Sequence, residues 1–448
     1  MIDTRATGVL SNLGNRRRYG YSLGNFSKSL QSSSVDLLYM FYLIHFLKTP
    51  PALAGGAIFA ALIPCSLADL IFGHVVDRRG SVGWGYRKLM IFGGLASAIS
   101  FPTMFLLPST EQSFSFEWAI GWFLVFRLSS TILDVPHNTL LSALTPVSRE
   151  RGRLSTLRFL FSSVGNLVVA GLIALFLPQQ AVSLAGMATY VCTITLLFVV
   201  TMATCVWAVG PVQKIAHPEA VSVSSLFRAL EDLSRNATFV RVLLLFVLAA
   251  CMITVFPRMA IFYAESFLGS ASKASVLISA QVIGQILSLP VWSLLQDRLT
   301  KRQVGMVAYG GFAIIMSIFL LLAPSSLRMA APLFSLAGAF LCGLTVMNWA
   351  IAPDTIKCGE IVPTKRHEAF TFGLLLAAIK VSTGAGAGFI GLSLQISGFE
   401  ASVAKGYSRI PGIAIGMAGI PLAGAIACLI ILAKLQLGNI YQKKHASP

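Results

Sequence analysis

The chain has 448 residues, of which 56% are hydrophobic and only 11% are charged. So few charged side chains cannot cover the surface of a soluble protein of this length. The composition therefore excludes an ordinary soluble globular protein and predicts a membrane protein. The net charge of +17 does not indicate nucleic-acid binding, because Lys and Arg stand in short clusters between apolar runs, as orientation signals of membrane helices do.

Twelve segments have the length and composition of membrane-spanning helices, since a hydrocarbon core of about 30 Å needs about 20 apolar residues. They are residues 19–47, 52–76, 88–107, 117–145, 156–177, 183–208, 239–267, 273–295, 304–323, 330–355, 368–397 and 410–436. We therefore predict an all-α membrane protein with two six-helix halves.

The longest polar interval falls at the centre of the chain and divides these halves. We expect an N-terminal six-helix bundle in residues 1–208, a central cytoplasmic loop in 209–238 and a C-terminal six-helix bundle in 239–448. Lys and Arg collect on the side of the membrane that holds this loop and both termini, so the positive-inside rule places that side in the cytoplasm. We expect a monomeric, multi-pass protein of the bacterial inner membrane.

The second span carries one carboxylate, Asp69, within an apolar run that ends in a Gly/Arg/Lys hairpin. A charge at that depth is costly unless it faces protein or water, so Asp69 is a functional candidate. In the hairpin, Asp77 with Arg78 and Arg87 is a predicted gate. Salt bridges that hold one access state and break in the other suit rocking of two rigid halves.

The fourth span contains Asp134 shortly before Pro136, and the fifth contains Arg158. Asp134 is either a substrate-linked or proton-linked carboxylate near the membrane midplane or a structural partner of Arg158. His137 is either a proton relay or a packed, hydrogen-bonded side chain.

Further cations lie inside the spans. Arg127 and Arg258 each have a carboxylate two helical turns along the same face, Asp134 and Glu265. One interpretation is two ion networks within single helices near the outer surface. The other is a cationic cavity for an anionic solute, because a guanidinium pairs well with carboxylate, sulfonate or phosphate. Its members would be Arg127, Arg158, Arg258 and Lys380.

Lys380 in the eleventh span is expected to pair with a carboxylate of the N-terminal half, Asp69 or Asp134. Asp354 and Glu360, near the loop between the tenth and eleventh spans, form either a second gate or a solvated loop. The seven cysteines are scattered without metal-ligand spacing, and no nucleophile–base constellation or phosphate loop is present. We expect no enzyme activity, no metal site and no cofactor.

Several motifs, in order, resemble those of one family, the glycoside–pentoside–hexuronide:cation symporters (melibiose permease-like) of the major facilitator superfamily. They are Tyr21-Ser-Leu-Gly24-Asn25-Phe-Ser-Lys28, Pro51-Ala-Leu-Ala-Gly55, Asp69-Leu-Ile-Phe-Gly73, Asp134-Val-Pro136, Arg158-Phe, Asp354 with Gly359-Glu360, and Lys380. The resemblance covers nearly the whole chain. It implies the major facilitator fold and a central solute site that includes Lys28, Asp134, Arg158 and Lys380.

The resemblance also implies a cation site, from which this sequence departs. Such symporters use two carboxylates one helical turn apart, helped by an Asn and a Thr. Here Asp69 and Thr131 match, but Cys65 and Ala68 stand at the other two positions. A thiol and a methyl are poor ligands for a hard cation such as sodium. An apolar helix favours a neutral carboxyl group, so we expect coupling to a proton through Asp69.

The solute site of this sequence also differs from the pattern that the resemblance implies. The carboxylate expected after Lys28 corresponds to Ser29, unless a small insertion shifts the register onto Asp36, and an expected aromatic residue is Asn138. We therefore predict a secondary active transporter for a small polar solute, neutral or anionic, such as a sugar, a glycoside or an acidic sugar. The alternatives are a lysolipid or amphiphile transporter of the same fold and a non-transporting membrane receptor.

Overall fold

The computed structural model describes residues 14–79, 85–106, 115–144, 148–176, 183–210, 235, 237–357, 365–399 and 410–435. All regular elements in these ranges are helical. The N-terminal half contains α1 (Asn15–His45), α2 (Pro51–Arg79), α3 (Tyr86–Leu106), α4 (Ser115–Leu144), α5 (Ser148–Phe176) and α6 (Leu184–Val209). The C-terminal half contains α8 (Ala237–Arg258), α9 (Ala260–Leu268), η2 (Ala271–Lys273), α10 (Ala274–Arg298), α11 (Lys301–Leu322), α12 (Leu327–Lys357), α13 (Lys365–Ile396), α15 (Pro411–Ala414), η3 (Ile415–Gly419) and α16 (Ile420–Ala433).

The predicted spans correspond to these helices, most of them within a few residues at each end. The largest difference is at α5, which begins at Ser148 rather than at residue 156, because helix-forming polar residues continue the helix beyond its apolar part. The seventh span is divided into α8 and α9 after Pro257, as expected where a proline removes a backbone donor. In the described part of the chain, eleven helical segments are long and apolar enough to cross a membrane. Helix α1, at 31 residues, is long enough but too polar to be counted among them.

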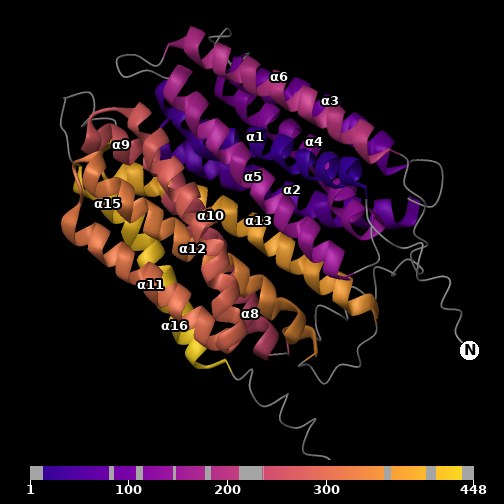
Figure 1. Ribbon diagram of the computed structural model, residues 1–448. Helices are drawn as coiled ribbons and strands as arrows, with labels where there is room; N and C mark the ends of the chain where they lie inside the picture. Colours follow the sequence, from indigo (N-terminus) through magenta and orange to yellow (C-terminus); the bar gives the residue numbers. More distant parts are fainter. Residues whose placement is uncertain are drawn as a thin grey trace, which may run out of the picture.

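The two halves lie side by side, α1 to α6 in indigo to magenta and α8 to α16 in rose through orange to yellow (Figure 1). Contacts between them are most extensive along α2 with α13 and α5 with α10. The proposed boundary at 209–238 stays a prediction, since residues 211–234 lie outside the described part.

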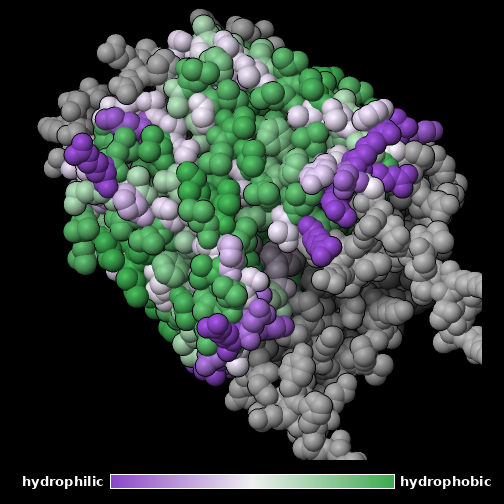
Figure 2. All heavy atoms as spheres, viewed as in Figure 1, coloured by the Kyte–Doolittle hydropathy of each residue, from purple (hydrophilic) through white to green (hydrophobic). Residues whose placement is uncertain are grey.

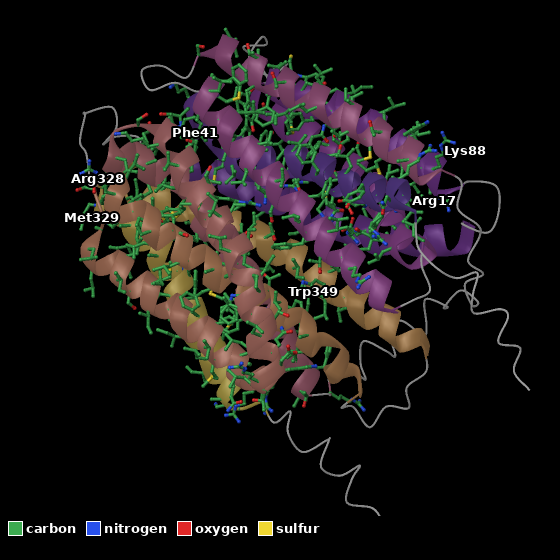
Figure 3. The ribbon with its side chains drawn as sticks, viewed as in Figure 1. Arg17, Phe41, Lys88, Arg328, Met329 and Trp349 are labelled. Atoms are coloured by element: carbon green, nitrogen blue, oxygen red, sulfur yellow. The ribbon has the colours of Figure 1, made fainter. Side chains whose placement is uncertain are left out.

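The surface matches a lipid environment. Figure 2 shows hydrophobic side chains over the middle of the molecule and hydrophilic ones toward its ends. Large apolar side chains such as Leu287 and Ile396 are 70% and 85% exposed, which lipid tolerates and water does not. Arg17 and Lys88 lie at one end of the molecule and Arg328 at the other (Figure 3). We call these the Arg17 end and the Arg328 end.

Small residues let helices approach closely. A Cβ at Gly284 of α10 would lie 1.9 Å from the carbonyl oxygen of Ser335 in α12, and a Cβ at Gly338 of α12 would lie 2.0 Å from that of Gln281 in α10. Membrane helices pack by such contacts because lipid offers no hydrophobic driving force between them.

This contact predicts a stability effect. Gly338→Ala should lower the free energy of unfolding by about 2 kcal/mol, because the added methyl group meets backbone and forces α10 and α12 apart. Gly310→Ala is the matched control, since a Cβ there meets nothing within 4 Å, and should be neutral or slightly stabilising. The measurement is thermal unfolding of both variants in one detergent. Equal melting temperatures for the two would contradict the packing argument.

Candidate functional site

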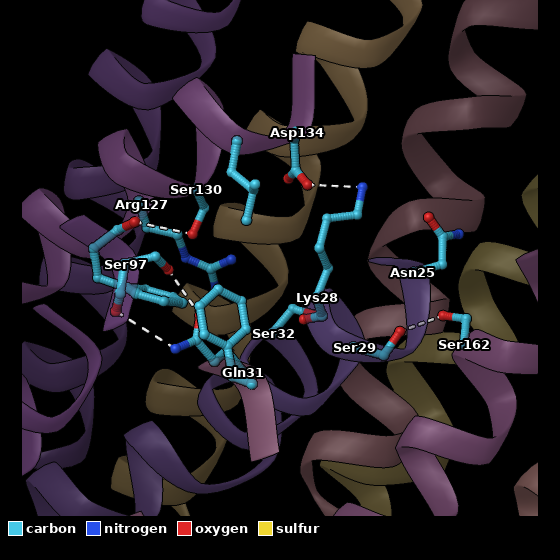
Figure 4. A pocket seen from close by; sticks show the side chains of 13 residues that line it. Asn25, Lys28, Ser29, Gln31, Ser32, Ser97, Arg127, Ser130, Asp134 and Ser162 are labelled. Atoms are coloured by element: carbon cyan, nitrogen blue, oxygen red, sulfur yellow. Dashed lines mark hydrogen bonds and ion pairs between the residues drawn. The ribbon is translucent and has the colours of Figure 1, made fainter. Parts of the chain in front are cut away.

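A polar cavity of about 240 Å³ lies among the helices of the N-terminal half. Its wall comes from α1, α3, α4, α5 and α6. It is lined by Asn25, Lys28, Ser29, Gln31, Ser32, Ser97, Phe126, Arg127, Ser130, Leu133, Asp134, Ser162 and Phe198 (Figure 4). Two cations and one carboxylate therefore face a space rich in hydroxyl and amide groups.

The central ion pair of the cavity joins α1 to α4. Lys28 Nζ lies 2.9 Å from Asp134 Oδ1, and the Asp134 side chain keeps 41% of its surface exposed against 15% for Lys28. An intramembrane carboxylate that is paired and still accessible can accept hydrogen bonds from a solute. The predicted role of Asp134 as a structural partner of Arg158 is wrong in this structure. Arg158 Nη2 instead donates to Asn138 Oδ1 at 2.7 Å.

Short polar residues form the rest of the wall. Ser97 Oγ donates to Gln31 Oε1 at 2.7 Å, and the hydroxyl groups of Ser29 and Ser162 share a hydrogen bond. Asn25 Oδ1 is buried without a hydrogen-bond partner, so it is free to accept a hydrogen bond from a bound molecule. Apart from Ser29, which stands where the family resemblance implies a carboxylate, the sequence analysis did not point to these residues as part of the site. The sequence feature that could have identified the residues of the first span is the unusual run of polar side chains within it.

A second ion pair joins the two halves. Lys380 Nζ of α13 forms a salt bridge with Asp69 Oδ2 of α2, and Thr131 Oγ1 of α4 donates to Asp69 Oδ1. The structure thus brings Asp69 and Thr131 together as the sequence predicted. Lys380 therefore pairs with Asp69, one of the two carboxylates that were proposed as its partner. The neighbouring Cys65 is buried, one helical turn from Asp69.

A third cluster consists of Asp36, Arg127 and Arg258. Asp36 Oδ1 accepts from Arg127 Nη2 at 2.9 Å and from Arg258 Nη2 at 2.8 Å. The predicted ion networks within α4 and within the seventh span are therefore wrong, because both arginines reach across to α1. Glu265 pairs with His45 instead, at 3.0 Å.

The predicted cationic cavity is found only in part. Of its four proposed members only Arg127 lines the cavity, where it is joined by Lys28. Arg258 and Lys380 are neutralised by Asp36 and Asp69, and Arg158 lies over the ring of Tyr21. Residues with the same charge ended in different places because sequence spacing reports the face of a helix, not which neighbouring helix that face meets.

The remaining candidates contribute less. His137 is fully buried and its ring stacks on Tyr21. The Nε2 atom of His137 forms a hydrogen bond with the backbone oxygen of Tyr21 at 3.1 Å, as in a packed histidine. The side chains of Asp77, Arg78 and Asp354, and all of Glu360, lie outside the described residues, while Arg87 is exposed. Among the described residues, no group of three or more His, Cys, Asp or Glu is placed to hold a metal ion.

Comparison with known proteins decides the family. The model of the family described as MFS/sugar transport protein matches residues 20–439. The chain belongs to this family. The resemblance to the glycoside–pentoside–hexuronide:cation symporters of the major facilitator superfamily is thereby confirmed, and so are the twelve-helix fold and the transporter class, which excludes an enzyme.

Two relatives of this sugar transport family illustrate the similarity. A glucuronide carrier protein homolog of Escherichia coli (strain K12) is 24% identical over 92% of this chain and 90% of its own length. An isoprimeverose transporter of Lactiplantibacillus pentosus is 21% identical over 95% of this chain and 89% of its own.

Solved structures show the same fold at lower identity. The nucleoside transporter NupG has a TM-score of 0.65 and 14% identity, with 93% of this chain and 99% of NupG covered. A D-xylose-proton symporter has a TM-score of 0.60 and 13% identity, with 93% and 95% covered. As a member of the family matched above, the chain is a multi-pass membrane protein and a secondary active transporter of a small solute.

Proposed function

We propose that this chain carries a small acidic sugar across the membrane together with a proton, by alternating access of its two halves. The observation that carries the proposal is the charge in and beside the cavity, where three cations, Lys28, Arg127 and Arg258, pair with only two carboxylates, Asp134 and Asp36. Because net charge in a low-dielectric site is costly, a negatively charged solute is favoured there. The relative named as a glucuronide carrier homolog supports the same solute class.

The uncharged wall suits a sugar. Serine hydroxyls, Asn25 and Gln31 exchange hydrogen bonds with hydroxyl groups, while Phe126 and Phe198 offer apolar surface to the C–H face of a ring. The volume of about 240 Å³ is below the range of roughly 300–1,000 Å³ typical of pockets for drug-sized ligands. A solute of one sugar ring is therefore favoured over a lysolipid.

The proton is favoured as the coupling ion by what surrounds Asp69. The ammonium group of Lys380 already occupies the place next to this carboxylate, and the neighbouring Cys65 offers a thiol where a hard cation needs oxygen. Protonation of Asp69 would break the pair with Lys380 and so loosen α2 from α13. This gives a proton a direct effect on the contact between the halves.

Orientation and assembly complete the proposal. We propose that the cationic Arg17 end is the cytoplasmic side, as the positive-inside rule favours, with both termini in the cytoplasm. The membrane is then the bacterial inner membrane, and the transporter acts as a monomer.

The test is thermal stability of the purified protein with neutral sugars, acidic sugars and lysolipids, each with and without sodium at two pH values. We expect stabilisation by an acidic sugar that changes with pH and ignores sodium. Uptake into proteoliposomes must follow the same solute. Stabilisation without flux would indicate a receptor, stabilisation by lysolipid an amphiphile transporter, and sodium-dependent stabilisation by a neutral glycoside would overturn both the solute class and the coupling ion.

A further inference from the structure

One carboxylate is shared by two arginines between the cavity and the Arg328 end. Asp36 lies on α1 between Lys28, which lines the cavity, and Phe41, which lies toward the Arg328 end (Figure 3). Both arginine contacts go to the same atom, Asp36 Oδ1, at 2.9 Å from Arg127 and 2.8 Å from Arg258. The two guanidinium groups therefore compete for one oxygen and repel each other. We call these three residues the outer bridge.

The outer bridge connects the two halves of the transporter. Asp36 and Arg127 belong to the N-terminal half, whereas Arg258 belongs to α8. Arg258 is buried, with 9% of its surface exposed, and its guanidinium does not lose its charge in a protein. It therefore depends on Asp36 for neutralisation.

Neighbouring contacts close the same end. His45 of α1 pairs with Glu265 of α9 at 3.0 Å, and the rings of Phe41 and Phe262 lie 6.1 Å apart. Together with the outer bridge, these contacts hold α1 against α8 and α9 toward the Arg328 end in this structure.

Arg127 belongs to the outer bridge and to the cavity wall at once (Figure 4). Its Nη2 binds Asp36, while its Nε is buried and has no hydrogen-bond partner. A buried donor left unpaired costs free energy that a bound acceptor recovers. An anion in the cavity can thus bind Arg127 and draw it from Asp36.

We propose that Asp36 is a positioning residue that couples solute binding to closure of the outer gate. An anionic solute neutralises Arg127, and Asp36 Oδ1 is then left to Arg258 of the opposite half. Binding of the solute therefore favours closure of the gate through which the solute entered. This inference rests on the proposed function in two respects, the negative charge of the solute and the orientation that makes the Arg328 end the outer side.

Two physical effects act in the same direction. Loss of the competing donor strengthens the bond between Asp36 and Arg258, and neutralisation of Arg127 lowers the repulsion that Arg258 feels. Coupling between two equilibria is reciprocal, so a closed outer gate must raise solute affinity by the factor by which solute favours closure. We expect a factor of about ten, within the usual range for coupled sites.

The experiment compares wild type, Arg258→Gln and Arg258→Lys, with Arg328→Gln as the control, because Arg328 is an exposed arginine at the same end. Spin labels on Lys48→Cys and Ser326→Cys, with the other cysteines replaced, report the distance between the halves at the Arg328 end. The probe is D-glucuronate. Affinity and uptake velocity are measured in parallel.

In wild type and in Arg328→Gln, glucuronate should shift the distance distribution toward the short distances of the closed gate. Arg258→Gln should lose this shift, bind glucuronate about tenfold more weakly, and lose more maximal velocity than affinity. Arg258→Lys should regain part of each, since an ammonium group still pairs with Asp36. If Arg258 had a purely structural role, the substitution would lower the amount of folded protein. The ratio of maximal velocity to affinity would then stay unchanged.

Two negative results are distinguishable. In one negative result, glucuronate still shifts Arg258→Gln toward the short distances of the closed gate, and this variant transports at the wild-type rate. The coupling through Asp36 is then overturned, while the proposed function stands. If wild type neither binds nor transports any acidic sugar, the proposed function is overturned, and the coupling is overturned with it.

Discussion

Replacing Asp69 with asparagine is expected to reduce proton-driven accumulation of the solute to the level set by its own gradient. Asp69 is the carboxylate that pairs with Lys380 and accepts from Thr131, and an amide cannot release a proton. Wild-type uptake should rise as the external pH falls, because the inward proton gradient that drives accumulation becomes larger. Uptake by Asp69→Asn should not depend on pH. Uptake into proteoliposomes with and without an imposed pH gradient measures both.

Loss of folding must be separated from loss of coupling. Asp69 and Lys380 keep 20% and 37% of their side-chain surface exposed, so the unpaired lysine should cost only about 1 kcal/mol of stability. Exchange of labelled for unlabelled solute needs no proton and should persist in Asp69→Asn. Asp297→Asn, at an exposed carboxylate of α10, is the control and should behave as wild type. Undiminished accumulation by Asp69→Asn would rule out Asp69 as the coupling group.

The second large effect is expected for Lys28→Gln, which should weaken binding of an acidic sugar by about 100-fold, since hydrogen bonds to charged groups contribute about 1.5–3 kcal/mol. The substitution removes one of the two cations of the cavity and leaves Asp134 unpaired next to the solute. A neutral sugar should lose much less affinity. Isothermal titration with glucuronate and with a neutral analogue gives the comparison.

The double variant Lys28→Gln/Asp134→Asn separates charge from packing. Removing the unpaired carboxylate should restore part of the lost affinity, because residues in contact do not act additively. Lys88→Gln, at an exposed lysine of α3, is the control. If both sugars lost affinity equally, the argument for an anionic solute from the cavity charge would be wrong.

The architecture of twelve helices could be predicted from the amino-acid sequence alone. Apolar length dictates spans because every backbone group must bond within the segment in lipid. For the same reason ionisable residues inside the spans, such as Asp69, Asp134 and Lys380, stand out as candidates. The combination of Asp69 with Thr131 was also predictable, because the family resemblance places them in the same site.

The pairing of the charges could not be predicted without the arrangement of the helices in space. Arg127 and Arg258 have carboxylates two turns along their own helices, yet both bind Asp36 of α1. Periodicity specifies which side chains share a face of a helix, while the partner depends on how the helices are arranged around one another. The polar wall with Asn25 and Gln31 was missed for a related reason. A serine or an amide in a span carries no charge to mark it, and its role appears only when several helices bring such groups around one cavity.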